Sequence, residues 1–557
     1  MLRTFETHEV RSTRVLSSKL WQFTPENSDK SMPVFIPSCW ETYPGYENYR
    51  GKAVYETTIT GEGNVKLEFK GVSHHAEVFV NNVNVGSHYG SYLPFSVYVK
   101  NLKKGSHSLK VVVDNSFSEE YSLDIPNDYY SYGGISRGVL LSQVPDAHIL
   151  WTHVTPLSCK NNIWTAKVEV TAKNISSQPV TADLNINIAE KEIVRNSINI
   201  QPGEDIIFSE IIEFENVRPW SMEEPNLYYV KTKLIENEKV TDDLIDRFGF
   251  RLVTVEGTKI LLNGKAIRIK GFCRHEDHPQ FGCAIPPEAI AADLNLIRDM
   301  GANSVRTVHY PSDEIMLDLC DEMGLLVWEE NHGRALQDTD MRNPNFRKQC
   351  EDVNYNMIKN HYNHPSIYIW GILNECGSDT EYGRSCYKEQ FEQIKSLDQS
   401  RPHTYAACKR DTDICQDLPD VNSWNIYPYW YEDLDTATNR LLFLQDLILK
   451  QTGKQKPLII SEVGAGGIYG WRPTTKDKWS EDRQAEIVGK QLREIIAFED
   501  CLGVYVWQFC DVRVDESWAM TRPRTRNNKG IVDDYRRPKL SYQVVKEIFK
   551  GISDYFE

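Results

Sequence analysis

The stretch Ser366-Ile-Tyr-Ile-Trp370-Gly-Ile-Leu-Asn374-Glu375 is a short apolar run that stops abruptly at a carboxylate. A second run, Pro457-Leu-Ile-Ile-Ser-Glu462, ends in the same way. Runs of this length are typical of strands that are buried on both faces of a parallel sheet. Either glutamate alone is equally well interpreted as a strand-end carboxylate in contact with water. The surrounding sequence decides whether the two glutamates are interpreted as a catalytic pair or as ordinary carboxylates in contact with water.

Around these two runs, strand-like and helical segments alternate over residues 251–557. The eight strand-like segments are 267–271, 302–307, 325–328, 366–370, 403–407, 421–425, 458–461 and 504–509. The helical segments between them have one apolar face, as Ile290, Leu294 and Ile297 show. This alternation predicts an α/β TIM barrel, in which Glu375 follows the fourth strand and Glu462 the seventh. Two carboxylates at the mouth of one barrel can cleave a glycosidic bond.

The first 250 residues have the alternating pattern of β-sandwiches. Runs at 53–59, 65–69, 76–80 and 108–113 predict a jelly-roll domain over residues 1–146. Further runs at 164–172 and 182–188 predict an immunoglobulin-like sandwich over residues 147–250. We therefore expect a multidomain chain with two N-terminal β-sandwiches, followed by the catalytic barrel of residues 251–557.

The composition of the chain argues against some classes of binding partner. The formal net charge of −16 over 557 residues disfavours nucleic acid and anionic membranes. The N-terminus has no apolar signal region, so we expect a cytoplasmic protein without membrane contact. The twelve cysteines are scattered without C-x-x-C pairs, so neither a metal site nor a cofactor is indicated. A homo-oligomer is expected, although no residue pattern fixes the number of subunits.

Two longer motifs make the comparison specific. The segments 303–311, with Arg306 and His309, and 363–375, which ends in Asn374-Glu375, resemble the signature segments of glycoside hydrolase family two. That family contains β-galactosidases, β-mannosidases and β-glucuronidases. The segment 78–95 is similar to the sugar-binding domain of the same family. The resemblance thus spans nearly the whole chain and implies a jelly roll, a sandwich and a barrel in this order.

The resemblance implies that Glu375 is the general acid/base and Glu462 the nucleophile of a retaining enzyme. Such an enzyme needs the two carboxyl groups about 5 to 5.5 Å apart, one protonated and one ionised. We expect apolar burial and the charge of Glu462 to keep Glu375 protonated. Hydrolysis by this mechanism requires no cofactor.

The resemblance also implies contacts with the sugar. Asn374 resembles the residue that hydrogen-bonds the sugar 2-OH, and Asp128 resembles an aspartate that reaches from the jelly roll to sugar hydroxyls. Four aromatic side chains are expected at the same strand ends: Tyr427, which would touch the nucleophile, Tyr431, His309 and Trp507, which would form the floor under the ring. For each of these residues the alternative is ordinary packing or capping within the barrel.

The substrate class follows from the group at the sugar C6. The segment Asn527-Asn-Lys529-Gly is similar to the Asn-x-Lys-Gly segment by which β-glucuronidases hold the substrate carboxylate. A lysine supplies a compact positive charge and an asparagine a directional donor. Arg334 stands where glucuronidases have a small apolar residue, and it is expected to meet the sugar O4 or the carboxylate. Because of Arg334, the sequence leaves open whether glucuronides or galacturonides are preferred. The alternative is that Arg334 is a surface residue outside the site.

We therefore predict a retaining exo-β-uronidase that hydrolyses terminal β-D-glucuronides or β-D-galacturonides, so the expected partner is a uronic-acid glycoside. A β-galactosidase of the same family is the first alternative, and the Asn-x-Lys segment argues against it. A non-catalytic carbohydrate-binding protein is the second alternative. The presence of both Glu375 and Glu462 argues against that reading.

Overall fold

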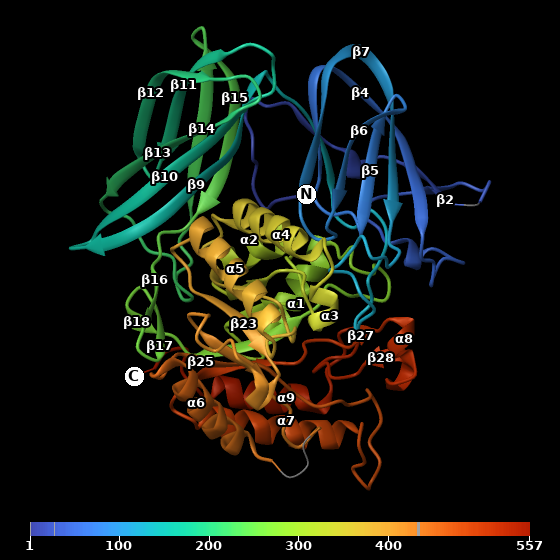
Figure 1. The fold of residues 1–557 in the computed structure, drawn as a ribbon, viewed down its shortest axis with the longest axis vertical. Coiled ribbons are helices and arrows are strands. Elements are labelled where there is room, and N and C mark those ends of the chain that lie inside the picture. Colours follow the sequence, from blue (N-terminus) through green and yellow to red (C-terminus); the bar gives the residue numbers. More distant parts are fainter. Residues whose placement is uncertain (1, 27, 432–434, 557) are drawn as a thin grey trace.

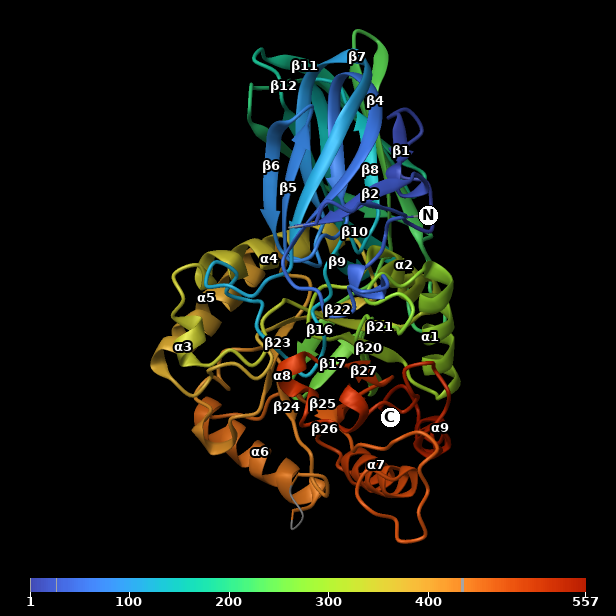
Figure 2. The same cartoon turned by 90° about the vertical axis from the view of Figure 1, so that its right-hand side faces the viewer.

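In the computed structural model, which describes residues 2–26, 28–431 and 435–556, two β-sandwiches stand side by side on one α/β barrel (Figure 1). The view turned by 90° shows the same separation of sandwiches and barrel (Figure 2). The predicted fold class is confirmed. The exact domain boundaries stay predictions.

The jelly roll is one set of hydrogen-bonded strands. Its strands are β1 (Thr13–Val15), β2 (Trp21–Pro25), β3 (Met32–Val34), β4 (Lys52–Phe69), β5 (His75–Val80), β6 (Val83–Tyr89), β7 (Phe95–Asp114) and β8 (Val139–Gln143), of which β4 and β7 are the longest. The runs 53–59 and 65–69, predicted as separate strands, both belong to β4, so that prediction is wrong. The pairing of β4 with β7 shifts register at Gly61 and Gly63, where Gly63 has a φ of 70°. Glycine permits such an irregularity, so the strand bends and continues.

The immunoglobulin-like sandwich has two antiparallel sheets. One sheet has the order β13-β10-β9, with bounds Asp205–Phe214, Ile163–Asn174 and Ala147–Lys160. The other has the order β12-β11-β14-β15, with bounds Lys191–Ile200, Val180–Ile188, Tyr228–Glu236 and Lys239–Phe248. Buried aromatic residues, among them Trp164 and Phe250, fill the space between the sheets. Inward residues alternate with outward ones along β10, as the sequence pattern predicted.

Eight parallel strands close the barrel in chain order: β19 (Ile269–Arg274), β20 (Ser304–Thr307), β21 (Leu326–Glu330), β22 (Ile367–Ile372), β23 (His403–Ala407), β24 (Asn422–Asn425), β25 (Leu458–Val463) and β26 (Cys501–Val506). All eight predicted strands are present. Short strands flank the barrel: β16 (Val253–Glu256), β17 (Lys259–Leu262) and β18 (Lys265–Ala266) before it, and β27 (Val512–Arg513) and β28 (Arg526–Asn527) after it. Strand residues are buried on both faces, which is why their runs lack polar alternation.

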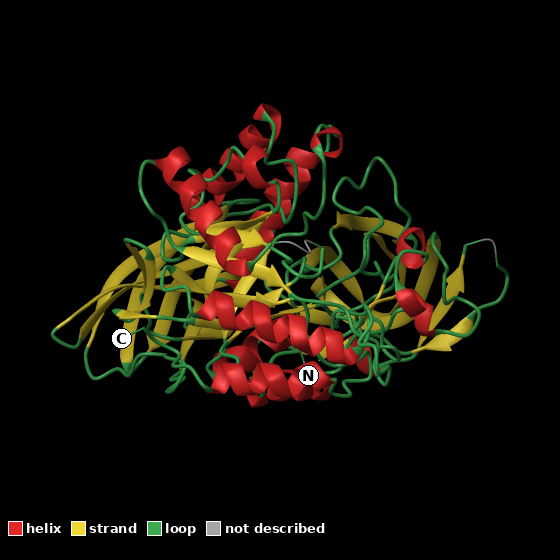
Figure 3. Ribbon diagram, turned by 90° about the horizontal axis from the view of Figure 1, so that it is seen from below, coloured by secondary structure: helices red, strands yellow, loops and turns green. Residues whose placement is uncertain are grey.

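Helices surround the barrel strands (Figure 3), whereas the described helical segments of the jelly roll are two short 3-10 turns, Leu16–Ser18 and Trp40–Thr42. The helices are α1 (Pro287–Asp299), α2 (Glu314–Met323), α3 (Asp338–Met341), α4 (Phe346–His361), α5 (Glu381–Leu397), α6 (Ala437–Thr452), α7 (Glu481–Ile496), α8 (Glu516–Ala519) and α9 (Leu540–Lys550). Helix α5 begins at Glu381, where the Thr380 side chain accepts from the Gly383 amide and caps the first turn. No helix in the described ranges is long and apolar enough to span a bilayer.

The loop that follows β7 carries Asp128 from the jelly roll to the barrel. Arg137, at the far end of this loop, pairs with Glu276 at 2.9 Å and donates to the Pro311 carbonyl at 2.9 Å. The Tyr132 hydroxyl donates to Asp277 at 2.8 Å. These contacts join the loop to the segments after β19 and β20, so a jelly-roll side chain is held at the mouth of the barrel.

Candidate active site

Glu462 lies at the C-terminal end of β25 and is 4% exposed. Its carboxylate accepts from Arg306 Nη1 at 3.1 Å and from the Tyr427 hydroxyl at 2.7 Å. Arg306 is fully buried on β20 and also donates to both oxygens of Glu330, at 2.9 and 3.0 Å. Burial would lower the pKa of this guanidinium, but the charge of Glu330 raises it, so Arg306 is a permanent cation beside Glu462.

Glu375 lies just beyond β22 and faces the same space as Glu462. Its carboxylate accepts from Asn425 Nδ2 at 2.9 Å, and Arg334 Nη2 lies 3.9 Å away. The Glu375 side chain is 23% exposed, so the expectation that this carboxylate is the apolar, buried one of the pair is wrong. The loop after β22 turns outward at Glu375, which has a φ of 56°, and leaves the carboxylate at the edge of the cavity.

The deeper carboxylate carries the perturbed pKa. Burial and the neighbouring charge of Glu375 raise the pKa of Glu462 to about 8, although Arg306 and Tyr427 act in the opposite direction. A carboxyl group with this pKa holds its proton at neutral pH, so the substrate-free site holds one proton beside Glu375.

Asn374 presents a free amide donor to the cavity. Its Oδ1 accepts from Arg306 Nη2 at 2.8 Å and from Asn425 Nδ2 at 3.2 Å. Because a guanidinium can only donate, Oδ1 must face Arg306 and the amide NH2 must face away. Nδ2 is buried and has no hydrogen-bond partner. Asn374 is thus oriented to donate to a ligand hydroxyl.

His309 and Trp507 form an aromatic wall beside Glu462. Their rings stack with centroids 5.0 Å apart, and His309 Nδ1 lies 2.9 Å from a Glu330 oxygen. His309 Nε2, 4.0 Å from Glu462, has no hydrogen-bond partner. Burial, together with the charges of Arg306 and Arg334, lowers the pKa of His309 well below its usual value, so this ring is neutral.

Asp128 joins residues from two segments of the barrel, the loop after β21 and the segment between β26 and α9. Its Oδ1 pairs with Arg334 Nη2 at 2.9 Å, while Oδ2 accepts from Asn527 at 3.1 Å and from Arg522 at 3.2 Å. Burial would raise the pKa of Asp128, but the charges of Arg334, Lys529 and Arg522 outweigh it and hold the carboxylate ionised. Arg334 is 9% exposed, so the alternative that it is a surface residue outside the site is wrong.

Lys529 is a buried cation that forms no ion pair with a carboxylate in the described ranges. It is 2% exposed, and its ammonium lies 5.2 Å from the Tyr431 ring centroid and 5.7 Å from that of Tyr427. The other two lysines buried to this degree in the described ranges, Lys270 and Lys539, have carboxylates at 2.8 and 2.7 Å. Lys529 forms no ion pair within the same ranges.

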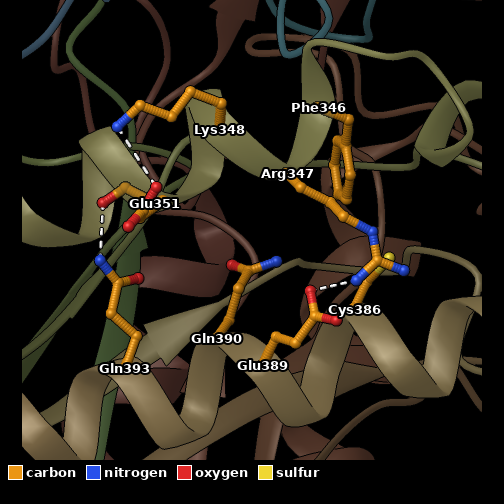
Figure 4. Close-up of a pocket in the computed structure, with 8 residues that line it drawn as sticks. All are labelled: Phe346, Arg347, Lys348, Glu351, Cys386, Glu389, Gln390 and Gln393. Atoms are coloured by element: carbon orange, nitrogen blue, oxygen red, sulfur yellow. Dashed lines mark hydrogen bonds and ion pairs between the residues drawn. The ribbon is translucent and has the colours of Figure 1, made fainter.

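The space next to Glu375 extends into a cavity of about 220 Å³. Residues of β24 and the loop after it line this cavity, including Asn425, Tyr427 and Tyr431. A larger cavity of about 420 Å³ lies between α4 and α5 and contains none of the predicted site residues (Figure 4). The Arg347–Glu389 pair joins α4 to α5 across this second cavity, whereas Glu375 lines the first.

The structure brings together all eleven predicted site residues and adds four that the sequence did not assign. The additions are Arg306, Glu330, Asn425 and Arg522. Arg306 and Glu330 had a usable signal, because each is a charged residue within a run that otherwise reads as a buried barrel strand. Asn425 ends its strand as Glu462 does. Arg522 had no distinguishing local signal among its neighbouring arginines.

One group of side chains has a spacing suited to a metal ion. Asp318, Asp321 and His364 have ligand atoms within 4.8 Å of one another. Arg3 pairs with Asp318 at 2.8 Å and His364 Nδ1 lies 2.6 Å from Asp321. These contacts form an ion-pair network that joins the N-terminal segment to α2, and it lies apart from the glutamate pair. The expected absence of a metal and a cofactor stays a prediction.

Known proteins resemble this chain along its full length. The family models for glycosyl hydrolases family 2 match at residues 23–145 (sugar binding domain), 147–251 and 253–553 (TIM barrel domain). A crystal structure of a GH2 beta-galacturonidase from Eisenbergiella tayi bound to galacturonate has a TM-score of 0.98 and 51% identity, and the match covers 100% of both chains.

Two curated relatives are more distant. A beta-glucuronidase of Streptococcus agalactiae is 28% identical over 90% of this chain and 87% of its own. A beta-galactosidase of Thermoanaerobacterium thermosulfurigenes is 30% identical over 98% of this chain and 72% of its own. The three domain matches, their order and the closed barrel agree: this chain belongs to glycosyl hydrolases family 2 and is a glycoside hydrolase.

Proposed function

We propose that this enzyme is a retaining exo-β-uronidase that removes terminal β-linked uronic acids, with galacturonides preferred over glucuronides. The buried ammonium of Lys529, which forms no ion pair with any residue that the structure describes, is the observation that carries this proposal. Burial of an uncompensated charge is costly, so the site is complete only when an anion occupies it. A substrate carboxylate at C6 supplies that anion, whereas the CH2OH group of a galactoside does not.

In the proposed mechanism Glu462 attacks the anomeric carbon while Glu375 gives its proton to the glycosidic oxygen. The leaving group departs and a covalent glycosyl-enzyme ester forms on Glu462. Glu375, now ionised, takes a proton from water as the water attacks the same carbon and releases the ester. Asn374 donates to the 2-OH through its free Nδ2, and Arg306 and Tyr427 favour the ionised form of the nucleophile by their charge and hydrogen bond.

Hydrolysis of three nitrophenyl glycosides tests this proposal. Under identical conditions the β-galacturonide and β-glucuronide should be cleaved with a far higher kcat/KM than the β-galactoside. A galactoside preference would establish the β-galactosidase alternative. No turnover of any of the three by folded protein would favour a carbohydrate-binding role.

Arg334 supports the preference for galacturonides. The residue is fixed by Asp128 and Asn127 and lies beside Glu375, on the loop after β21. The two epimers differ only in the direction of O4, and a charge-assisted hydrogen bond from a guanidinium contributes about 1.5 to 3 kcal/mol. The 51%-identical structure, which is of a beta-galacturonidase bound to galacturonate, is consistent with this choice.

Replacing Arg334 with Ala should lower the ratio of galacturonide to glucuronide kcat/KM by about tenfold, which corresponds to 1.4 kcal/mol. Both kcat/KM values are measured on the same preparations, so loss of active protein cancels in the ratio. Arg342→Ala is the matched control, since Arg342 pairs with Asp338 on the partly exposed α3. An unchanged ratio in the Arg334 variant would remove this residue from the recognition of O4.

The proton held in the substrate-free site predicts the pH profile. Because the site loses this proton at about pH 8 and then has none to give to the leaving group, kcat/KM should fall as the pH rises above that value. In Glu375→Gln the negative charge that raises the pKa of Glu462 is absent, so Glu462 should ionise at a lower pH. With a dinitrophenyl uronide, which needs no acid, the decline above pH 8 should then disappear. A decline that persists in Glu375→Gln would assign it to another group.

The predicted assembly into a homo-oligomer and the cytoplasmic location stay predictions. Light scattering of the purified chain measures the first, and fractionation of the source cells measures the second. The preceding assays do not depend on either.

A further inference from the structure

The segment 527–530 is held from behind by a buried ion pair. The Lys539 ammonium, just before α9, donates to Asp511 Oδ1 at 2.7 Å, to the Gly467 carbonyl at 2.6 Å and to the Asn528 carbonyl at 3.2 Å. Lys539 is 3% exposed, so these three acceptors replace water. One ammonium thereby joins the loop after β25, the loop after β26 and the segment that carries Lys529.

Backbone contacts complete the attachment. The Gly530 amide donates to Asp511 Oδ1 at 2.9 Å, and the Gly467 amide donates to the Asn528 carbonyl at 2.8 Å. The Gln508 amide, next to Trp507, donates to the Lys529 carbonyl at 3.1 Å. A Cβ on Gly530 would lie 2.2 Å from the Asp511 amide nitrogen, so the segment is packed as closely as a glycine allows.

The Lys529 side chain has fewer such anchors. It has no ion pair in the described ranges: its ammonium lies beside the rings of Tyr427 and Tyr431, interacts with Tyr431 and acts by its charge on Asp128. Its position therefore depends on the backbone to which it is attached. A displacement of about 1 Å in a binding group can cost on the order of 10²-fold in rate.

We infer that Lys539, paired with Asp511, is a positioning residue for uronide recognition and acts through Lys529. This inference rests on the proposed function, because it assigns a purpose to the carboxylate-reading segment. It predicts a selective effect on KM: the carboxylate contact is the same in the ground state and the transition state, so its loss weakens binding without slowing the chemical step.

Lys539→Met, which keeps the length of the side chain and removes its three donors, tests the inference. The KM for a nitrophenyl uronide should rise by about tenfold and kcat should stay within about threefold of the wild type. Lys546→Met is the matched control, because Lys546 lies on α9 and pairs with Asp299 near the surface. A merely structural role would instead lower kcat in proportion to the active sites titrated by a mechanism-based label.

A double-mutant cycle shows whether Lys539 acts through Lys529. If it does, adding Lys539→Met to Lys529→Ala should change KM by less than about twofold, since the two effects are not additive. A full tenfold further effect, or a single variant with wild-type KM, would overturn the inference. If Lys539→Met does not fold, Asp511→Asn replaces it as the test. This variant keeps an acceptor for the Gly530 amide and removes the charge that pairs with Lys539. An unchanged KM in Asp511→Asn would overturn the inference.

Failure of the proposed function would look different. In that case the wild-type enzyme cleaves no uronide, or Lys529→Ala leaves uronide turnover unchanged. If the wild-type enzyme and Lys529→Ala behave as proposed and only Lys539→Met has no effect on KM, the positioning role of Lys539 alone is wrong.

Discussion

Replacing Glu462 with Gln is expected to lower kcat by a factor on the order of 10³ or more, because an amide cannot form the glycosyl ester on which the retaining route depends. The substitution changes one atom of a side chain that is 4% exposed, so packing is preserved. The Tyr427 hydroxyl and Arg306 Nη1 would still face the amide, although Arg306 would lose a charged partner. The measurement is single-turnover hydrolysis of a nitrophenyl uronide.

Glu375→Gln is the matched variant, since it makes the same change at the other member of the pair. It should fail mainly on poor leaving groups, which need a proton donor in the first step, and retain more activity on good ones, for which only the general base of the second step is lost. A slow 2-fluoro glycosyl substrate should label Glu462 in the wild type, as peptide mass spectrometry can show. A label on another residue, or a tenth of wild-type activity in Glu462→Gln, would reject these roles.

Lys529→Ala is expected to lower kcat/KM for uronides by about 2 to 4 kcal/mol, roughly 30-fold to 1000-fold. The substrate carboxylate would enter a partly desolvated space that no longer holds its counter-ion. Asn527 remains, but its neutral amide already donates a hydrogen bond to Asp128. It therefore cannot replace the positive charge of Lys529. Steady-state kinetics on a uronide and on the corresponding neutral galactoside measure the effect.

Neutral galactosides should be affected little by Lys529→Ala, because they present no charge to Lys529. Lys529→Met is a useful companion, since it keeps the apolar contact with Tyr427 and Tyr431 and removes only the ammonium. Equal losses on both substrate classes would mean that Lys529 supports the fold and does not recognise the carboxylate.

Much of the fold could be predicted because its signals are local. The barrel strands β22 and β25 each read as an apolar run that ends at a glutamate, and all eight strands were found this way. The break predicted within β4 was wrong for a local reason as well: Gly61 and Gly63 lie between the two predicted runs, and their pairing with β7 makes them a bulge. Turn-forming residues have the same sequence signal in both settings.

The sequence predicted which residues form the site better than it predicted their burial and charge. The motifs named Glu375, Glu462, Asn374 and Lys529, and the structure gathers them at one barrel mouth. They did not show that Glu462 is the buried carboxylate and Glu375 the partly exposed one. Which carboxylate loses its water depends on how the loop after β22 turns, and that is decided by packing.

The sequence by itself determined the order of the domains, the eight barrel strands and the identities of the two glutamates. The tertiary structure alone decided which charges are paired. Arg334 finds Asp128 on a loop of the jelly roll and Lys539 finds Asp511, whereas Lys529 is left without a counter-ion in the described part of the chain. Ion pairing and burial depend on distances between residues that are remote along the chain, and periodicity and spacing do not encode those distances.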